Sequence, residues 1–143
     1  MSSRPYHVRY HEGSPLVLAP TKGIEAIADA IMARYFHDGY RARKAGTVAR
    51  FRRRLTTTDA TGYVGCCNAV GQVDTTARLG QIAVPVLAIA GELDQGTPVA
   101  MAQTLADAIP EAALTVLKEA SHLSAVEQPP AFNAAVTAFI ASL

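Results

Sequence analysis

The sequence predicts an α/β fold in which helices cover both faces of a short parallel sheet. Its second half alternates two apolar runs, at residues 84–90 and 114–117, with two segments of helical character. The first run has no polar alternation, which is typical of a strand covered on both faces. The order strand, helix, strand, helix favours a parallel sheet. A length of 143 residues allows one domain with a core.

The first half is expected to be mainly short helices. Residues 1–20 are punctuated by proline and glycine and are expected to be irregular. Residues 21–35 repeat apolar positions at helical spacing, namely Ile24, Ile27, Ala28, Ile31 and Tyr35. A second helix is expected over about 46–55. Asp59 can cap a third helix with one apolar face, made of Tyr63, Cys66, Cys67 and Val70.

The second half supplies the two strand–helix units. A helix is expected to open at Thr97-Pro98 and to end near Pro110, because proline suits a first turn. A closing helix is expected over 129–143. The chain therefore divides into an irregular segment (1–20), a helical region (21–78) and a region of two parallel β-α units (79–143).

Composition excludes some partners. The formal net charge is +1, which gives no general attraction to nucleic acid or to an acidic membrane. No apolar stretch approaches the roughly 18 residues that span a bilayer. The first residues are polar and lack the apolar centre of a signal peptide, so a cytoplasmic location is expected.

The two cysteines, Cys66 and Cys67, are adjacent in the sequence. Neighbouring cysteines cannot bond to each other without strain, and two are too few for a disulfide framework. We expect them to be reduced and buried in a helix, with a catalytic thiol as the less favoured interpretation.

An acid and a histidine are the candidate catalytic residues. Asp94 follows the first predicted strand and His122 follows the second. Ligands and catalytic groups of parallel sheets lie beyond the carboxyl ends of the strands. There a carboxylate can hold one imidazole nitrogen while the other takes a proton from a nucleophile. Glu92, two residues before Asp94, is an alternative acid that spacing alone does not exclude.

The expected nucleophile of such a site is missing. The sequence contains no G-x-S-x-G segment, and Gly13-Ser14-Pro15 lacks both the second glycine and a preceding apolar strand. Ser121 and Ser124 are poor substitutes because they flank His122 on one loop.

A basic run lies in the helical region. Its members are Arg41, Arg43, Lys44, Arg50, Arg52, Arg53 and Arg54. The favoured interpretation is a solvated helix face. Alternatively, one arginine could bind a substrate carboxylate, since a guanidinium suits a bidentate contact. Nucleic-acid binding is least favoured because no recognised nucleic-acid-binding module accompanies the run.

Four segments carry a family resemblance: GIEAIADAIMARYF, TTDATGYVGCCNAV, IAVPVLAIAGELDQGTP and EASHLSAVEQPPAFNAAVTAFI. They are similar to the C-terminal half of the α/β-hydrolase superfamily and, within it, to the 3-oxoadipate enol-lactonases. The first two resemble the helical cap, and the last two resemble core strands seven and eight with their helices. The resemblance implies a partial α/β-hydrolase fold with Asp94 as triad acid and His122 as triad base. It also implies hydrolysis of a small carboxylated enol-lactone in aromatic catabolism, with no metal or organic cofactor.

The chain departs from the family in lacking the earlier core strands, the nucleophile elbow and the oxyanion hole. We therefore expect a carboxylic ester hydrolase that is inactive until another polypeptide supplies the serine. The alternative is a truncated, non-catalytic fragment that persists as a self-associating domain. In either case the open sheet edge predicts a homo-oligomer.

Overall fold

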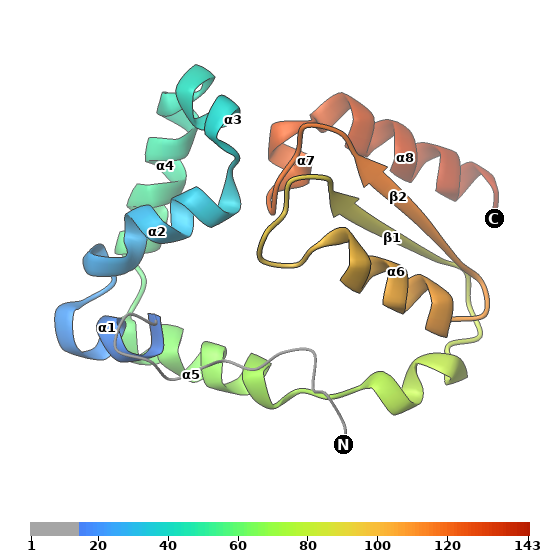
Figure 1. The fold of residues 1–143 in the computed structure, drawn as a ribbon, viewed down its shortest axis with the longest axis horizontal. Coiled ribbons are helices and arrows are strands. Elements are labelled where there is room, and N and C mark those ends of the chain that lie inside the picture. Colours follow the sequence, from blue (N-terminus) through green and yellow to red (C-terminus); the bar gives the residue numbers. More distant parts are fainter. Residues whose placement is uncertain (1–14) are drawn as a thin grey trace. The chain divides into compact units, whose positions relative to one another are not determined.

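The computed structural model describes residues 15–143, and the expected irregularity of residues 1–14 lies outside that range. Short helices precede a pair of strands, each of which is followed by helix (Figure 1). In chain order the elements are α1 (Pro15–Lys22), α2 (Glu25–Tyr35), α3 (Asp38–Arg43), α4 (Ala45–Thr56), α5 (Ala60–Gln72), the 3₁₀ helix η1 (Thr76–Gln81), β1 (Val86–Gly91), α6 (Val99–Ala108), β2 (Ala112–Leu117), α7 (Ser124–Glu127) and α8 (Pro129–Ala141).

The described residues form two compact units. The first contains residues 15–32 and Gly46–Thr75, and the second contains Ala33–Ala45 and Thr76–Leu143. The expected helical region, 21–78, is therefore not one structural body. Its segment Ala33–Ala45 groups with the strands, because the hydrogen bonds of residues 34–40 go to the loop and short helix that follow β2.

The expectation of irregular structure was wrong for residues 15–20, which lie in helix α1. Proline is tolerated in a first helical turn because the amide there has no intrahelical partner. The helix then stops at Gly23, whose φ of 77° is left-handed and whose N–H donates to the carbonyl of Ala19 at 3.0 Å. That stop also separates α1 from α2, so the helix expected over 21–35 begins only at Glu25.

The first unit buries the apolar face that spacing predicted in α2. Ile24, Ile27, Ala28 and Ile31 are all buried. Helix α4 confirms the helix expected over 46–55, and Asp59 caps α5 by accepting from the N–H of Gly62 at 2.7 Å.

The burial expected of the cysteines was wrong. Both are free thiols in α5, but Cys66 is exposed and Cys67 is only half-buried. Helix α5 contacts α1 within its unit, yet none of its residues is buried and Val70 on the expected inner face is 62% exposed. An apolar repeat marks a face that can be covered, and the described part of this unit does not cover it.

The second unit contains the predicted parallel sheet. Strands β1 and β2 pair in parallel, with Val86 opposite Ala112 and Gly91 opposite Leu117. Helix α6 connects the strands and packs against both, and α8 lies on the other side of the pair (Figure 1). The strands therefore end at the same edge, which brings the loops after Gly91 and Leu117 together.

Three elements of this unit, α3, η1 and α7, are too short to give a periodic apolar signal. Helices α3 and α7 lie by the ends of the strands, where Phe36, Tyr40 and Ala120 are buried, whereas η1 precedes β1 and contacts α6. Across residues 15–143 no helix is both long enough and apolar enough to cross a membrane.

Candidate active site

The loops that follow the two strands lie in direct contact. The N–H of Glu92 donates to the carbonyl of Leu117 at 2.9 Å, and the N–H of Leu93 donates to the carbonyl of Ala120 at 2.8 Å. Gly91 permits this approach, since a Cβ at that position would lie 2.6 Å from the Ala120 carbonyl oxygen. A side chain at residue 91 would therefore push the two loops apart.

This contact brings together the two candidate catalytic residues. Nδ1 of His122 lies 2.9 Å from Oδ2 of Asp94. The Asp94 side chain is 5% exposed and that of His122 is 38% exposed. The buried carboxylate thus holds one ring nitrogen of a more accessible imidazole, and no described residue hydrogen-bonds to Nε2 of that ring.

Asp94 is fixed by further donors. Its Oδ1 accepts from the backbone N–H groups of Gly96 at 2.8 Å and Thr97 at 3.0 Å, and the Thr97 hydroxyl donates to Oδ2 at 2.6 Å. Burial by itself would raise the pKa of Asp94. The hydrogen bonds from Thr97, His122 and Gly96 together outweigh burial and hold the pKa below its ordinary value. Asp94 is therefore an anion at neutral pH, as a partner of imidazole must be.

The geometry separates Asp94 from the alternative acid. Glu92 forms an ion pair with Lys118 at 2.6 Å and accepts from the N–H of Glu119. Lys118 and that N–H lower the pKa of the Glu92 carboxyl. Glu92 makes no contact with His122 among the described hydrogen bonds, so Asp94 is the acid that meets the histidine.

Tyr35 also belongs to the site, although its helical spacing assigned it to the apolar face of its helix. Its ring stacks on the His122 imidazole, with centroids 5.3 Å apart and planes 17° apart. Its carbonyl accepts from the N–H of Leu123 at 3.0 Å. Tyr35 ends the apolar series of α2, and nothing in the helical spacing marks it as a partner of a residue 87 positions later.

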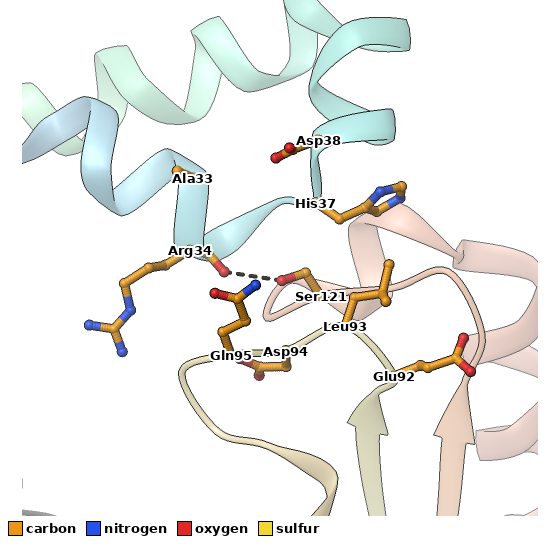
Figure 2. A pocket seen from close by; sticks show the side chains of 9 residues that line it. All are labelled: Ala33, Arg34, His37, Asp38, Glu92, Leu93, Asp94, Gln95 and Ser121. Atoms are coloured by element: carbon orange, nitrogen blue, oxygen red, sulfur yellow. Dashed lines mark hydrogen bonds between the residues drawn. The ribbon is translucent and has the colours of Figure 1, made fainter.

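A cavity of about 500 Å³ lies beside Asp94. Figure 2 shows its lining, which comes from the end of α2, the start of α3 and the loops after β1 and β2. The lining residues are Ala33, Arg34, His37, Asp38, Glu92, Leu93, Asp94, Gln95 and Ser121. The dashed line in the figure is the bond from the Ser121 hydroxyl to the Arg34 carbonyl, 3.1 Å long.

The carboxylates of this lining are already engaged. Asp38 pairs with Arg41 at 2.6 Å, while Glu92 pairs with Lys118 and Asp94 contacts His122. The guanidinium of Arg34, in contrast, makes no ion pair with any residue in the range 15–143. It lies against Gly96, where a Cβ would be 2.9 Å from Nη2. Arg34 is therefore an exposed cation of the lining without an ion-pair partner among the described residues, and Figure 2 shows its guanidinium turned away from the other labelled side chains.

The basic run does not line this cavity. Most of its members are exposed, in agreement with a solvated surface: Arg43, Lys44, Arg50, Arg53 and Arg54. Arg52 is held at 2.6 Å by both Asp29 and Glu25, which raise its already high pKa further.

Neither serine beside His122 hydrogen-bonds to its imidazole in the described structure. Ser121 is 3% exposed and donates to the Arg34 carbonyl, and Ser124 begins α7. Within residues 15–143, no three histidine, cysteine or acidic side chains are grouped as metal ligands.

The fold and the acid–histidine pair define the class to which this chain belongs. A profile described as the alpha/beta hydrolase fold matches residues 12–129, and the chain is a member of that family. In sequence it is similar to 3-oxoadipate enol-lactonase 2 of Acinetobacter baylyi, with 40% identity over 121 residues. It is 28% identical to 3-oxoadipate enol-lactonase 1 of the same organism over the same length.

Solved structures give the same result. The enol-lactonase of Burkholderia xenovorans LB400 matches 89% of this chain with a TM-score of 0.86 and 35% identity. A hydrolase from Pseudomonas aeruginosa PA01 matches 88% with a TM-score of 0.81 and 32% identity. The chain spans 45% of each curated lactonase and 48% and 47% of these two structures, which is about half of each relative. The expected partial α/β-hydrolase fold is thus confirmed.

Proposed function

We propose that this chain carries the acid and the base of a serine hydrolase site that cleaves small carboxylated esters or lactones. The observation that carries the proposal is the 2.9 Å contact between Asp94 and His122 at the ends of two parallel strands. The similarity to 3-oxoadipate enol-lactonases supports an enol-lactone substrate. The corresponding setting is aromatic catabolism in the cytoplasm.

The proposed roles follow from the geometry. Asp94 accepts the Nδ1 proton of His122, so that Nε2 is free to take the proton of an attacking hydroxyl. The anionic Asp94 then stabilises the imidazolium that forms. His122 returns the proton to the leaving group, which in a lactone is the enolate oxygen of the opened ring.

The nucleophile and the oxyanion hole come, in this proposal, from a segment outside these 143 residues. Ser121 is buried with its hydroxyl engaged, and the sequence contains no G-x-S-x-G turn. Such a segment fits beside β1. The N–H groups of Val86 and Glu92 point to β2, so alternation directs the peptide groups of Leu87 and Ile89 to the opposite edge. That edge has no strand partner among residues 15–143.

Arg34 is the proposed contact for the substrate carboxylate. It is the cation of the cavity beside Asp94 that lacks an ion pair among the described residues. A guanidinium binds a carboxylate through two parallel hydrogen bonds, which fixes orientation as well as charge. Arg34 takes the role that the sequence offered, as the less favoured alternative to a solvated surface, to an arginine of residues 41–54.

Complementation tests this function. The chain is co-expressed with the part of the Acinetobacter 3-oxoadipate enol-lactonase 2 that it does not match, and hydrolysis of 3-oxoadipate enol-lactone is measured. We expect turnover only when both polypeptides are present. Asp94→Asn should reduce kcat by about 10⁴-fold, as loss of the histidine's acid partner does in serine hydrolases. The matched control Glu92→Gln should keep turnover within a few-fold.

Arg34→Gln gives the test of substrate class in the same assay. It should raise KM for the carboxylated lactone at least tenfold and leave p-nitrophenyl acetate hydrolysis unchanged. Complex formation is followed separately by sedimentation. A stable complex without turnover, or equal activity of the Asp94 and Glu92 variants, would contradict the proposal.

A non-catalytic, self-associating domain is the second candidate. The observation in its favour is exposed apolar surface in the second unit, where Val84, Leu93, Val116 and Ile140 are at least 36% exposed. An inactive complex in the complementation assay would favour this candidate.

A further inference from the structure

Glu127 is a buried carboxylate whose two oxygens hold two backbone amides. Oε1 accepts from the N–H of His37 at 2.9 Å, and Oε2 accepts from the N–H of Ser121. The residue is 7% exposed and has no cation within ion-pair distance among residues 15–143. A buried charge in such a place is stabilised by the amides it joins, so the two donors and the acid depend on one another.

The two amides belong to segments that enclose the histidine. Ser121 directly precedes His122, and His37 follows the residue pair Tyr35-Phe36 at the end of α2. Two further bonds run between the same segments: the Ser121 hydroxyl to the Arg34 carbonyl at 3.1 Å, and the Leu123 N–H to the Tyr35 carbonyl at 3.0 Å. The loop is thereby held on both sides of His122.

These bonds between residues 34–37 and the histidine loop fix the position of the imidazole. Asp94 meets it at the Nδ1 edge, and the Tyr35 ring covers one face at 5.3 Å. The stacking of Tyr35 on His122 requires a fixed distance between residues 34–37 and the loop that carries His122. Of the contacts that fix this separation, the Glu127 carboxylate is the one that reaches backbone donors on both segments.

We propose that Glu127 is a positioning residue that sets the orientation of His122 between Asp94 and Tyr35. Its value for catalysis rests on the proposed function, but the orientation itself can be measured without turnover. A carboxylate fits this place because each of its two oxygens must accept a hydrogen bond from a backbone N–H. In Glu127→Gln, one end becomes an NH₂ group that faces a backbone N–H, so one of the two amides loses its partner.

The test uses the full chain and the Nδ1 proton of His122, observed by NMR in ¹⁵N-labelled protein. In the wild type this proton is hydrogen-bonded to Asp94 and should give a downfield signal with cross-peaks to the Tyr35 ring. Glu127→Gln should speed exchange of that proton about tenfold or more. The reason is that the backbone N–H of Ser121 or His37 loses its acceptor, so the loop that carries His122 opens more often. The matched control Glu111→Gln, an exposed acid, should leave both signals unchanged.

A second pair of variants isolates one amide. His37 has φ −69°, which a proline ring adopts without strain, and it follows a residue outside the helices. His37→Pro therefore removes the N–H that donates to Oε1, whereas His37→Ala keeps it. His37→Pro should reproduce the faster exchange and His37→Ala should not.

The outcomes decide the matter even if one variant fails to fold. Should Glu127→Gln be unfolded, the comparison of His37→Pro with His37→Ala stands alone. Folded variants with an unchanged Nδ1 signal and unchanged Tyr35 cross-peaks would overturn the proposal. An inactive complementation complex with altered signals would instead contradict the proposed function and leave the positioning role intact.

Discussion

The hydroxyl of Thr97 donates to Oδ2 of Asp94, the same oxygen that faces Nδ1 of His122. The hydroxyl also lies 3.3 Å from that ring nitrogen, so three polar groups meet at one point. The Asp94 carboxylate has four hydrogen-bonding contacts, two of them with Thr97. Thr97 thus contributes to fixing the carboxylate before any substrate is present.

Removal of this hydroxyl should weaken the fold locally. Thr97→Val keeps the shape and the backbone N–H but deletes the donor to Oδ2. We expect the free energy of unfolding to fall by about 1–3 kcal/mol, as for a hydrogen bond to a charged group, and the pKa of Asp94 to rise. Urea denaturation at pH 7 measures the first effect. Thr104→Val, which removes an exposed side chain-to-backbone bond in α6, is the control and should cost less than Thr97→Val.

The depressed pKa of Asp94 predicts a specific loss of stability in acid. Because its folded-state pKa lies below the ordinary 3.8, Asp94 stabilises the fold above that pH and loses its contribution as pH falls through the folded value. Wild type and Asp94→Asn should therefore differ by a constant amount near pH 5 and converge below about pH 3.8. Unfolding curves between pH 5 and pH 2 measure the difference. Parallel curves down to pH 2 would show that the carboxylate is not stabilised in the fold.

The close approach of the two loops at Gly91 predicts that alanine substitution has opposite effects on stability at Gly91 and at Gly65. Gly91→Ala should destabilise the chain by about 1–3 kcal/mol, because the new Cβ meets the backbone oxygen of Ala120 and neither backbone can easily move. Gly65→Ala, in helix α5 with no neighbouring atom in the way, should stabilise by about 0.4–1 kcal/mol. Thermal unfolding of both variants checks the signs. Equal effects at the two positions would mean that the loops do not approach as described.

The open edge of β1 predicts self-association when no other segment covers it. Unpaired strand edges pair readily with other chains, and two strands are too few for independent stability. We expect a homo-oligomer, most simply a two-fold dimer, by sedimentation at micromolar concentration. Ile89→Pro removes an N–H on the open edge and should shift the protein toward monomer. Ala88→Pro, on the edge that faces β2, should instead unfold it.

The same experiment can include the part of the Acinetobacter 3-oxoadipate enol-lactonase 2 that this chain does not match, to test whether that part covers the open edge. If it occupies the same edge, it should dissociate the oligomer in proportion to its concentration. A folded monomer whose melting is independent of dilution would contradict the prediction.

Sequence patterns were most informative where one local rule determines the outcome. The unbroken apolar run before Gly91 predicted β1, Asp59 predicted the start of α5, and the segments after each strand placed Asp94 and His122 at one edge. Those features depend on neighbours in the chain. The choice of Asp94 over Glu92 depended on Lys118, a partner 26 residues away from Glu92 that no local pattern identifies.

The remaining errors also arise from contacts between residues that are far apart in the sequence. Tyr35 belongs to the apolar repeat of α2, yet its ring lies on His122, and the repeat contains no sign of that role. The apolar face of α5 was correctly read as helical, but whether it is covered depends on other elements. Glu127 did leave a signal in the segment EASHLSAVEQP, where an acid follows the histidine by five residues. Its contact with His37, 90 positions earlier, could come only from the fold.

The path of the chain between the two compact units has a consequence for the surroundings of the histidine. The backbone passes from one unit to the other near residues 32–33, 45–46 and 75–76. The first two crossings bracket Ala33–Ala45, the strip that contains Tyr35 and the His37 amide. The bonds from residues 34–40 to the histidine loop anchor it at several points along its length. Asp94 and Tyr35, which contact the imidazole on its edge and on its face, therefore both belong to the second unit, as His122 itself does.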